Sequence, residues 1–286
     1  MRLFAVALSV LFVASGQGKE PGDMENSYQN LQKAVKDNDA AQVKKLAAET
    51  SAAARAIISA PAPQGDIEKE TWTKDAAYAK EVDAYTEYAL YTVGVQAKPA
   101  EAVELFALLE QQSPKSKYLD DGYGFYLGCL RQTGGGAKVV GIAAKGLANF
   151  PGNEDLLMLM AESSMAGKRY DATIGYADRL VAAASKRNKT ANVGQGYYLS
   201  GVGRFFKNQY PQTDKSLRAA LPLIQGDQKA CALFYLGVAN YQLGKATMNK
   251  GLIRQGATFS EQSAAVKSPC QQQAYRNSLA MKAEAK

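Results

Sequence analysis

The stretch Phe234-Tyr235-Leu236-Gly237 defines the repeating unit of this 286-residue chain. The same pattern stands at Phe125-Tyr126-Leu127-Gly128, and a looser copy is Tyr197-Tyr198-Leu199-Ser200-Gly201. When the three glycines are taken as equivalent, Ala161 and the neighbourhood of Ala89-Leu90 occupy two further equivalent positions, and neighbouring positions are 33 to 40 residues apart. A period in the thirties with insertions of variable length indicates an array of helix pairs.

From Ser27 onward the chain has the apolar spacing of helices. Apolar residues recur at every third or fourth position, breaks fall at Gly, Pro, Asn and Asp, and no strand-like alternation appears. The clearest break in the N-terminal part is the loop 60–66, with the sequence Ala-Pro-Ala-Pro-Gln-Gly-Asp, which separates a first helical pair at about 27–57 from the rest. The expected fold class is all-α.

The repeated residue types have a physical reason in a stack of helix pairs. One pair cannot bury its apolar face alone, so neighbouring pairs must pack against each other. We expect the glycine of each unit to let two helices approach closely, while the aromatic residues and leucines fill the seam between units. Such a stack presents an open surface rather than a reaction chamber.

These residues resemble the tetratricopeptide repeat family, whose unit is a helix-turn-helix of about 34 residues. The first helix of that unit is matched by 234–241, and both the first helix and the turn are matched by 156–161 followed by 166–172. The resemblance implies a right-handed α-solenoid of about five pairs, preceded by the N-terminal pair and followed by a capping helix at 271–285. The expected organisation is a signal peptide at 1–16, an N-terminal helical pair with its loop at 17–81, and the repeat array at 82–286.

The resemblance also implies which side chains face a concave groove. Exposed aromatic and Met side chains suit a surface that grips other proteins. The alternative is that each of these aromatic residues belongs to the packing between helices, as aromatic residues at helical spacing usually do. The groove candidates are Met158, Glu162, Tyr198, Phe205, Phe206, Phe234 and Tyr241.

The first residues have the pattern of an export signal. Arg2 precedes an apolar-to-small run from Leu3 to Ala14, and small residues near Ser15 and Gly16 suit cleavage by signal peptidase. The alternative, a buried N-terminal helix, is disfavoured by the Gly and Pro residues that follow at once. The run is shorter than a membrane span needs. We expect a protein exported to the periplasm or the extracellular space, with no transmembrane segment.

Export gives meaning to the three cysteines, because disulfides persist in oxidising compartments. An odd number leaves at least one cysteine unpaired within the chain. Cys129 lies in an apolar helical stretch and is expected to be a buried thiol. Cys231 and Cys270 each stand near the start of an expected helix, about one helical pair apart. The sequence therefore predicts a Cys231–Cys270 disulfide.

The chain contains no histidine, which excludes Ser-His-Asp and Cys-His nucleophiles and His-ligated metals. We therefore expect no enzyme, no cofactor and no metal site. The expected function is a non-enzymatic scaffold of the cell envelope that binds peptide or helical segments of other exported proteins. The alternative is an enzyme or enzyme accessory that acts on envelope polymers, in which a carboxylate such as Glu162 does chemistry. Self-association through the C-terminal helices is a third interpretation.

Charge is divided unevenly along the chain, whose formal net charge is +7. Residues 194–286 hold 12 Lys and Arg against 4 Asp and Glu, whereas 17–193 are close to neutral at −2. A basic end attracts acidic partners or an anionic envelope surface, and export argues against nucleic acid. An ordinary solvated surface explains the same charge equally well.

Overall fold

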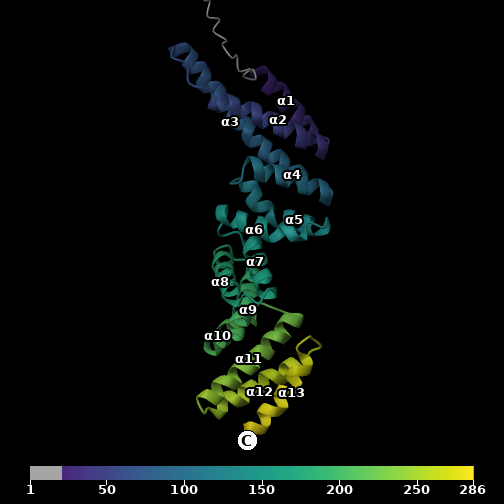
Figure 1. Ribbon diagram of the computed structural model, residues 1–286, viewed down its shortest axis with the longest axis vertical. Helices are drawn as coiled ribbons and strands as arrows, with labels where there is room; N and C mark the ends of the chain where they lie inside the picture. Colours follow the sequence, from purple (N-terminus) through teal and green to yellow (C-terminus); the bar gives the residue numbers. More distant parts are fainter. Residues whose placement is uncertain (1–20, 286) are drawn as a thin grey trace, which may run out of the picture. The chain divides into compact units, whose positions relative to one another are not determined.

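The computed structural model describes residues 21–285, and within them every regular element is an α-helix (Figure 1). Thirteen helices are found in this range. They fall into two compact units, one comprising the described residues up to Ser113 and the other beginning at Pro114. The predicted signal peptide at 1–16 lies outside the described residues. None of the helices in 21–285 is both long and apolar enough to span a membrane.

The first unit contains α1 (Pro21–Lys36), α2 (Ala40–Ser59), α3 (Asp66–Gly94) and α4 (Pro99–Gln112). Asp39 caps α2 by accepting the amide of Gln42 at 3.0 Å, and Pro99 stands in the first turn of α4, where its missing N–H costs nothing. Consecutive helices pack together, and α1 also reaches α3 while α2 reaches α4. A small cluster formed by Met24, Ala53, Ala54, Ala79 and Val82 is the core between α1, α2 and α3.

The N-terminal helical pair expected at about 27–57 falls in α1 and α2, and the loop expected at 60–66 separates α2 from α3. Residues 81 and 82, the expected boundary between the N-terminal segment and the repeat array, lie inside the continuous helix α3. The boundary between the two compact units comes later, after Ser113.

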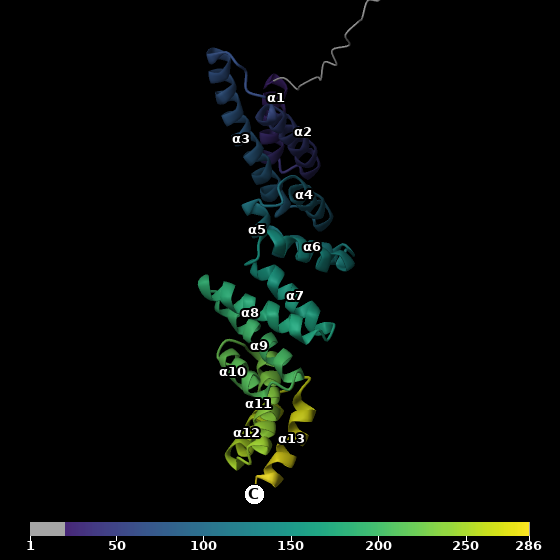
Figure 2. The same cartoon turned by 60° about the vertical axis from the view of Figure 1, so that its left-hand side comes forward.

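The second unit contains nine helices that follow one another in chain order (Figure 2). Each packs against the next, and α5, α7, α9 and α11 also contact the next odd-numbered helix. This pattern of contacts is that of a helical array. Its helices are α5 (Lys117–Gln132), α6 (Gly136–Asn149), α7 (Glu154–Ala166), α8 (Tyr170–Lys186), α9 (Thr190–Phe206), α10 (Tyr210–Ala220), α11 (Gly226–Ala246), α12 (Lys250–Ala264) and α13 (Gln271–Glu284).

The turns inside three successive pairs repeat the same backbone geometry. Lys168, Asn208 and Met248 have φ values of 55°, 57° and 52° and are spaced 40 residues apart. In each turn the amide of the following residue donates to a carbonyl five residues earlier, at 2.8 to 2.9 Å. This is the helix-ending bond of a Schellman motif. The repeat is therefore present in local backbone structure even where the side chains differ.

Several hydrogen bonds in the second unit join residues that are 33 positions apart in the sequence. The Asn153 amide donates to the Asp120 carbonyl at 2.8 Å, and the Ser263 hydroxyl donates to the Ala230 carbonyl at 2.7 Å. Asn153 also caps α7 by accepting the amide of Leu156. The bond from Asn153 to Asp120 fixes the start of α7 against α5 of the preceding pair, whereas the bond from Ser263 to Ala230 fixes α12 against α11 within one pair.

The expected close approach at the repeated glycine is correct at two of three positions. A Cβ atom on Gly237 would lie 2.9 Å from the Gly256 carbonyl oxygen, and one on Gly201 would lie 2.6 Å from Leu217 Cγ. A Cβ on Gly128 would meet nothing within 4 Å. The expectation was therefore wrong for Gly128, because no neighbouring helix comes that close to this position.

Candidate functional site

The odd-numbered helices α7, α9 and α11 are joined by a row of polar side chains. The Gln195 amide donates to the Glu162 carboxylate at 3.3 Å, and the Gln228 amide donates to the Gln195 side-chain oxygen at 2.6 Å. Each residue lies 33 positions from the next, so the row follows the repeat. It fixes the register of the three helices on which most of the candidate site residues stand.

The second unit also contains an aromatic cluster, whose members come from α8, α9, α10 and α11. Tyr170 stacks on Phe206, with ring centroids 4.8 Å apart and planes 12° from parallel. Phe205 lies 4.8 Å from Tyr235, and Phe234 lies 5.1 Å from Tyr235. Offset-stacked and edge-to-face rings at these separations attract one another. We define the aromatic cluster as Tyr170, Phe205, Phe206, Tyr210, Phe234 and Tyr235.

The cluster is exposed at its outer edge and anchored at its inner edge. Phe206 keeps 44% of its surface exposed, and the other members are half-buried. Tyr235 and its neighbour Tyr198 pack against the core that contains Val202 and Leu236. Burial raises the pKa of Tyr198 to about 12 and also raises that of Tyr235. Both phenols are therefore neutral at physiological pH, and the surface offers apolar ring faces rather than charge.

Ion pairs hold the end of α9 that carries the two phenylalanines. The Lys207 ammonium lies 2.8 Å from the Asp171 carboxylate, and the Arg204 guanidinium lies 2.9 Å from Asp178. Arg204 also bonds the hydroxyls of Ser200 and Ser216. Because Asp171 and Asp178 both belong to α8, these contacts fix α9 against it. These ion pairs therefore hold Phe205 and Phe206, at the end of α9, in place beside α8.

The structure brings together only some of the predicted groove residues. Phe205, Phe206 and Phe234 belong to the aromatic cluster, and Tyr198 lies beside it. None of the seven predicted residues is fully buried. Three members of the cluster, Tyr170, Tyr210 and Tyr235, were not predicted. The signal for the first two is present in the sequence, because each follows a repeated turn and they stand 40 residues apart.

Met158 and Glu162 lie elsewhere, in an open pocket of about 160 Å³ between α5 and α7. Arg131 and Asp155 also line this pocket. The Asp155 carboxylate lies close to Gly124, where an added Cβ atom would be only 2.6 Å from a carboxylate oxygen. Two carboxylates thus line one pocket, but both project from α7, seven residues apart.

Tyr241 lies near the C-terminal end of α11, away from the aromatic cluster. Its ring is 5.7 Å from the Lys245 ammonium. Hydrogen bonds from Tyr241 and Lys245 lower the pKa of the Glu284 carboxyl, and Lys245 approaches that carboxylate at 2.9 Å. Tyr241 also packs against the core that contains Ile253 and Met281. In this structure it joins α11 to the last helix.

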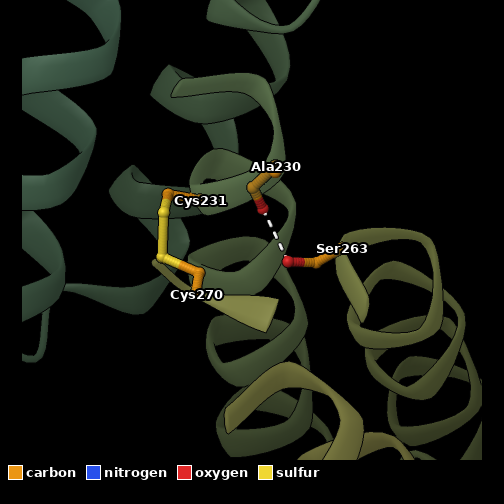
Figure 3. Close-up of a disulfide and its surroundings, with 4 residues drawn as sticks. All are labelled: Ala230, Cys231, Ser263 and Cys270. Carbon is orange, nitrogen blue, oxygen red and sulfur yellow. Dashed lines mark hydrogen bonds between the residues drawn. A yellow bond between two sulfur atoms is a disulfide. The ribbon is translucent and has the colours of Figure 1, made fainter. Parts of the chain in front are cut away.

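Figure 3 shows a disulfide that includes Cys231. Cys231 stands about one helical turn before Phe234 on α11. The disulfide joins Cys231 to Cys270 at the start of α13, with Cα atoms 5.4 Å apart. This is the pairing that the sequence predicted. The bond from Ser263 to the Ala230 carbonyl lies next to it. Cys129 is a free, buried thiol whose pKa is raised by burial.

Among residues 21–285, no three His, Cys, Asp or Glu side chains are grouped so that they could hold a metal ion. The row of polar side chains offers amide groups, and the aromatic cluster offers ring faces with a few paired charges nearby. Comparison of the chain with protein-family models gives no match, and comparison with curated proteins gives none either.

Proposed function

We propose that this protein is a tetratricopeptide-like scaffold of the cell envelope and that the aromatic cluster binds a segment of a partner protein. The observation that carries the proposal is the aromatic cluster itself, with Phe206 exposed beside five half-buried rings. Large aromatic side chains contribute most of the binding energy in many protein interfaces. They lose little conformational entropy because their neighbours already fix them.

Side-chain amides on α9 and α11, the helices that carry Phe205, Phe206 and Phe234, favour one kind of bound segment. Gln195 and Gln228 bring side-chain amide groups to the same helices that carry the rings. Such groups suit the backbone of a bound peptide, while the rings suit its apolar side chains. We expect a segment with one or two large apolar residues as the anchor and no dense charge.

The localisation in this proposal is the periplasm or the extracellular space. The Cys231–Cys270 disulfide supports it, because such bonds persist in oxidising compartments. The N-terminal sequence, in which Arg2 precedes an apolar run, is typical of an export signal and agrees with the same compartment.

The test combines site-specific crosslinking with affinity measurement. A photo-crosslinking phenylalanine analogue is placed at position 206 or, as a control, at position 248. Met248 is apolar and 92% exposed, but it lies in the turn between α11 and α12. The captured segment is identified by mass spectrometry, synthesised and titrated calorimetrically against the wild type. The proposal expects capture from position 206 and not from position 248.

Point variants then measure the contribution of the exposed ring. Phe206→Ala should weaken binding of the captured peptide by about tenfold or more, the effect of removing an interface anchor. Met248→Ala should leave the affinity unchanged, and circular dichroism should show both variants folded. Equal capture at the two positions, or an unchanged affinity in folded Phe206→Ala, would contradict the proposal.

The second candidate function is an enzyme or enzyme accessory that acts on envelope polymers. The pocket that Asp155 and Glu162 share is the observation in its favour. However, residues seven apart on one helix are separated by about 10.5 Å along its axis, and they do not face each other across a cleft. A Glu162→Gln variant that lost a polymer-cleaving activity of the wild type while keeping its fold would establish this candidate instead.

A further inference from the structure

A basic pocket lies in the second unit between α8 and the turn that precedes α7. Its volume is about 350 Å³. The charged residues that line it are Arg179, Lys186 and Arg187, and no carboxylate lines it. Ala182 and Ala183 form a floor of small side chains, and the segment 151–152 completes the lining. This basic pocket is not part of the aromatic cluster.

The three cations of the basic pocket are only partly neutralised. Arg179 donates to the Pro151 carbonyl at 2.9 Å, which orients its guanidinium without cancelling its charge. Arg187 lies 3.9 Å from the buried Glu154 carboxylate, but Lys189 shares that carboxylate at 3.7 Å. Lys186 is exposed and takes part in no ion pair with another described residue. The pocket therefore keeps a net positive charge and attracts anions.

The spacing of the cations favours a long ligand over a small ion. Arg179 and Lys186 are seven residues apart, which is about two helical turns or 10.5 Å along α8. The small residues between them leave room along the floor. A chain that carries regularly repeated anionic groups can contact both ends at once, whereas one inorganic phosphate reaches only one.

We propose that the basic pocket binds a linear polyanion with closely repeated phosphate groups. Guanidinium groups form paired hydrogen bonds with phosphate oxygens, and a lysine ammonium serves as a mobile point charge beside them. The pocket lies outside the basic segment 194–286, which charge counting had suggested as the docking region. The inference stands independently of partner binding at the aromatic cluster.

The test measures binding of a short linear polyphosphate to the full protein by fluorescence or calorimetry over a range of salt concentrations. The double variant Arg179→Ala/Lys186→Ala keeps Arg187 beside the buried Glu154. It should weaken binding roughly tenfold or more, because two charge-assisted contacts are lost. It should also lower the slope of log affinity against log salt by about one for each cation removed.

A matched control removes the same two charges elsewhere. Lys250 and Arg276 are exposed and lie on α12 and α13, and the variant Lys250→Ala/Arg276→Ala has the same net charge as the first. It should bind polyphosphate like the wild type. An equal loss in both variants would show that general charge, not this pocket, attracts the polymer, and would overturn the inference.

Two further probes separate the sources of anionic charge. Polyglutamate of matched length tests carboxylate chemistry, and vesicles that contain phosphatidylglycerol test a membrane surface. The inference expects tighter binding to polyphosphate than to either probe, and loss of that preference in Arg179→Ala/Lys186→Ala. Equal binding to polyglutamate, or binding to vesicles alone, would overturn it.

Discussion

The Cys231–Cys270 disulfide should contribute a large share of the stability of the C-terminal helices. It joins α11 to the first turn of α13 and thus encloses the rest of α11, all of α12 and the connection to α13. We expect reduction, or the double variant Cys231→Ser/Cys270→Ser, to destabilise this segment without changing its fold. Buried Ala274, Ser278 and Met281 would still hold α13 in place.

The magnitude follows from the length of chain that the disulfide closes. The two cysteines are 39 residues apart. In the chain-entropy treatment, a loop of that length restricts the unfolded state by about 13 cal/mol/K, or about 4 kcal/mol at 25 °C. Removing the disulfide should therefore lower the free energy of opening of α12 and α13 by about this amount.

Hydrogen exchange followed by mass spectrometry measures the effect locally, which matters because the chain has two compact units and need not unfold in one step. Peptides from α12 and α13 should exchange faster in the reduced protein, by up to about a thousandfold for 4 kcal/mol. Peptides from α1 and α2 serve as the internal control. The buried Cys129 thiol is free in both redox states and does not contribute to the difference.

Two results would refute this reasoning. The first is unchanged exchange of α12 and α13 after complete reduction. The second is mass mapping of the exported protein that finds Cys231 and Cys270 as free thiols. If the double variant exchanges like the oxidised wild type, the disulfide contributes nothing beyond the packing around it.

Three other predictions concern the packing of the array. Gly237→Ala should lower the free energy of unfolding in urea by about 1–3 kcal/mol, because the added methyl meets side-chain and backbone atoms of α12. Gly128→Ala should be neutral or stabilising by up to about 1 kcal/mol. Equal losses in the two variants would show that the close approach at Gly237 is unimportant. The raised pKa of Tyr198 means that its contribution to stability is complete below pH 10 and declines as pH rises toward 12. The loss is roughly 2 kcal/mol in unfolding measurements, and a Tyr198→Phe variant with the same alkaline decline would contradict it. Asn153→Ala removes a helix cap together with a hydrogen bond between repeats and should lower the free energy of unfolding by roughly 2 kcal/mol. Asn249→Ala removes only a helix cap and should lower it by roughly 1 kcal/mol. Equal losses of stability in thermal unfolding of the two variants would contradict a role for the bond to Asp120.

The candidate site was predictable from the sequence only in part. Phe205, Phe206 and Phe234 could be singled out because the resemblance to the repeat family implies groove-facing positions for them, with Phe234 equivalent to Tyr198 and Phe205 equivalent to Tyr241. The same argument placed Tyr241 with them, whereas the structure places it beside Lys245 and Glu284. A helix rotates by about 100° per residue, so a small error in register moves a side chain to another face.

By itself the sequence determined that the chain is helical, roughly where its helices end, and that it contains a repeat. Helices and turns depend on local preferences, such as the spacing of apolar residues and the residues at helix ends, and these can be read from neighbouring positions. The Cys231–Cys270 pairing also followed from the repeat, because corresponding helix starts are close in a stack.

The tertiary structure alone decided which side chains meet. It joined Tyr170 to Phe206, left Gly128 without a close neighbour, and placed Arg179 against the Pro151 carbonyl. These contacts depend on the crossing point and rotation of helices that are far apart in the sequence, which follow from the packing of all side chains at once. That is why the complete aromatic cluster and the basic pocket, on which the two proposals rest, became visible only in three dimensions.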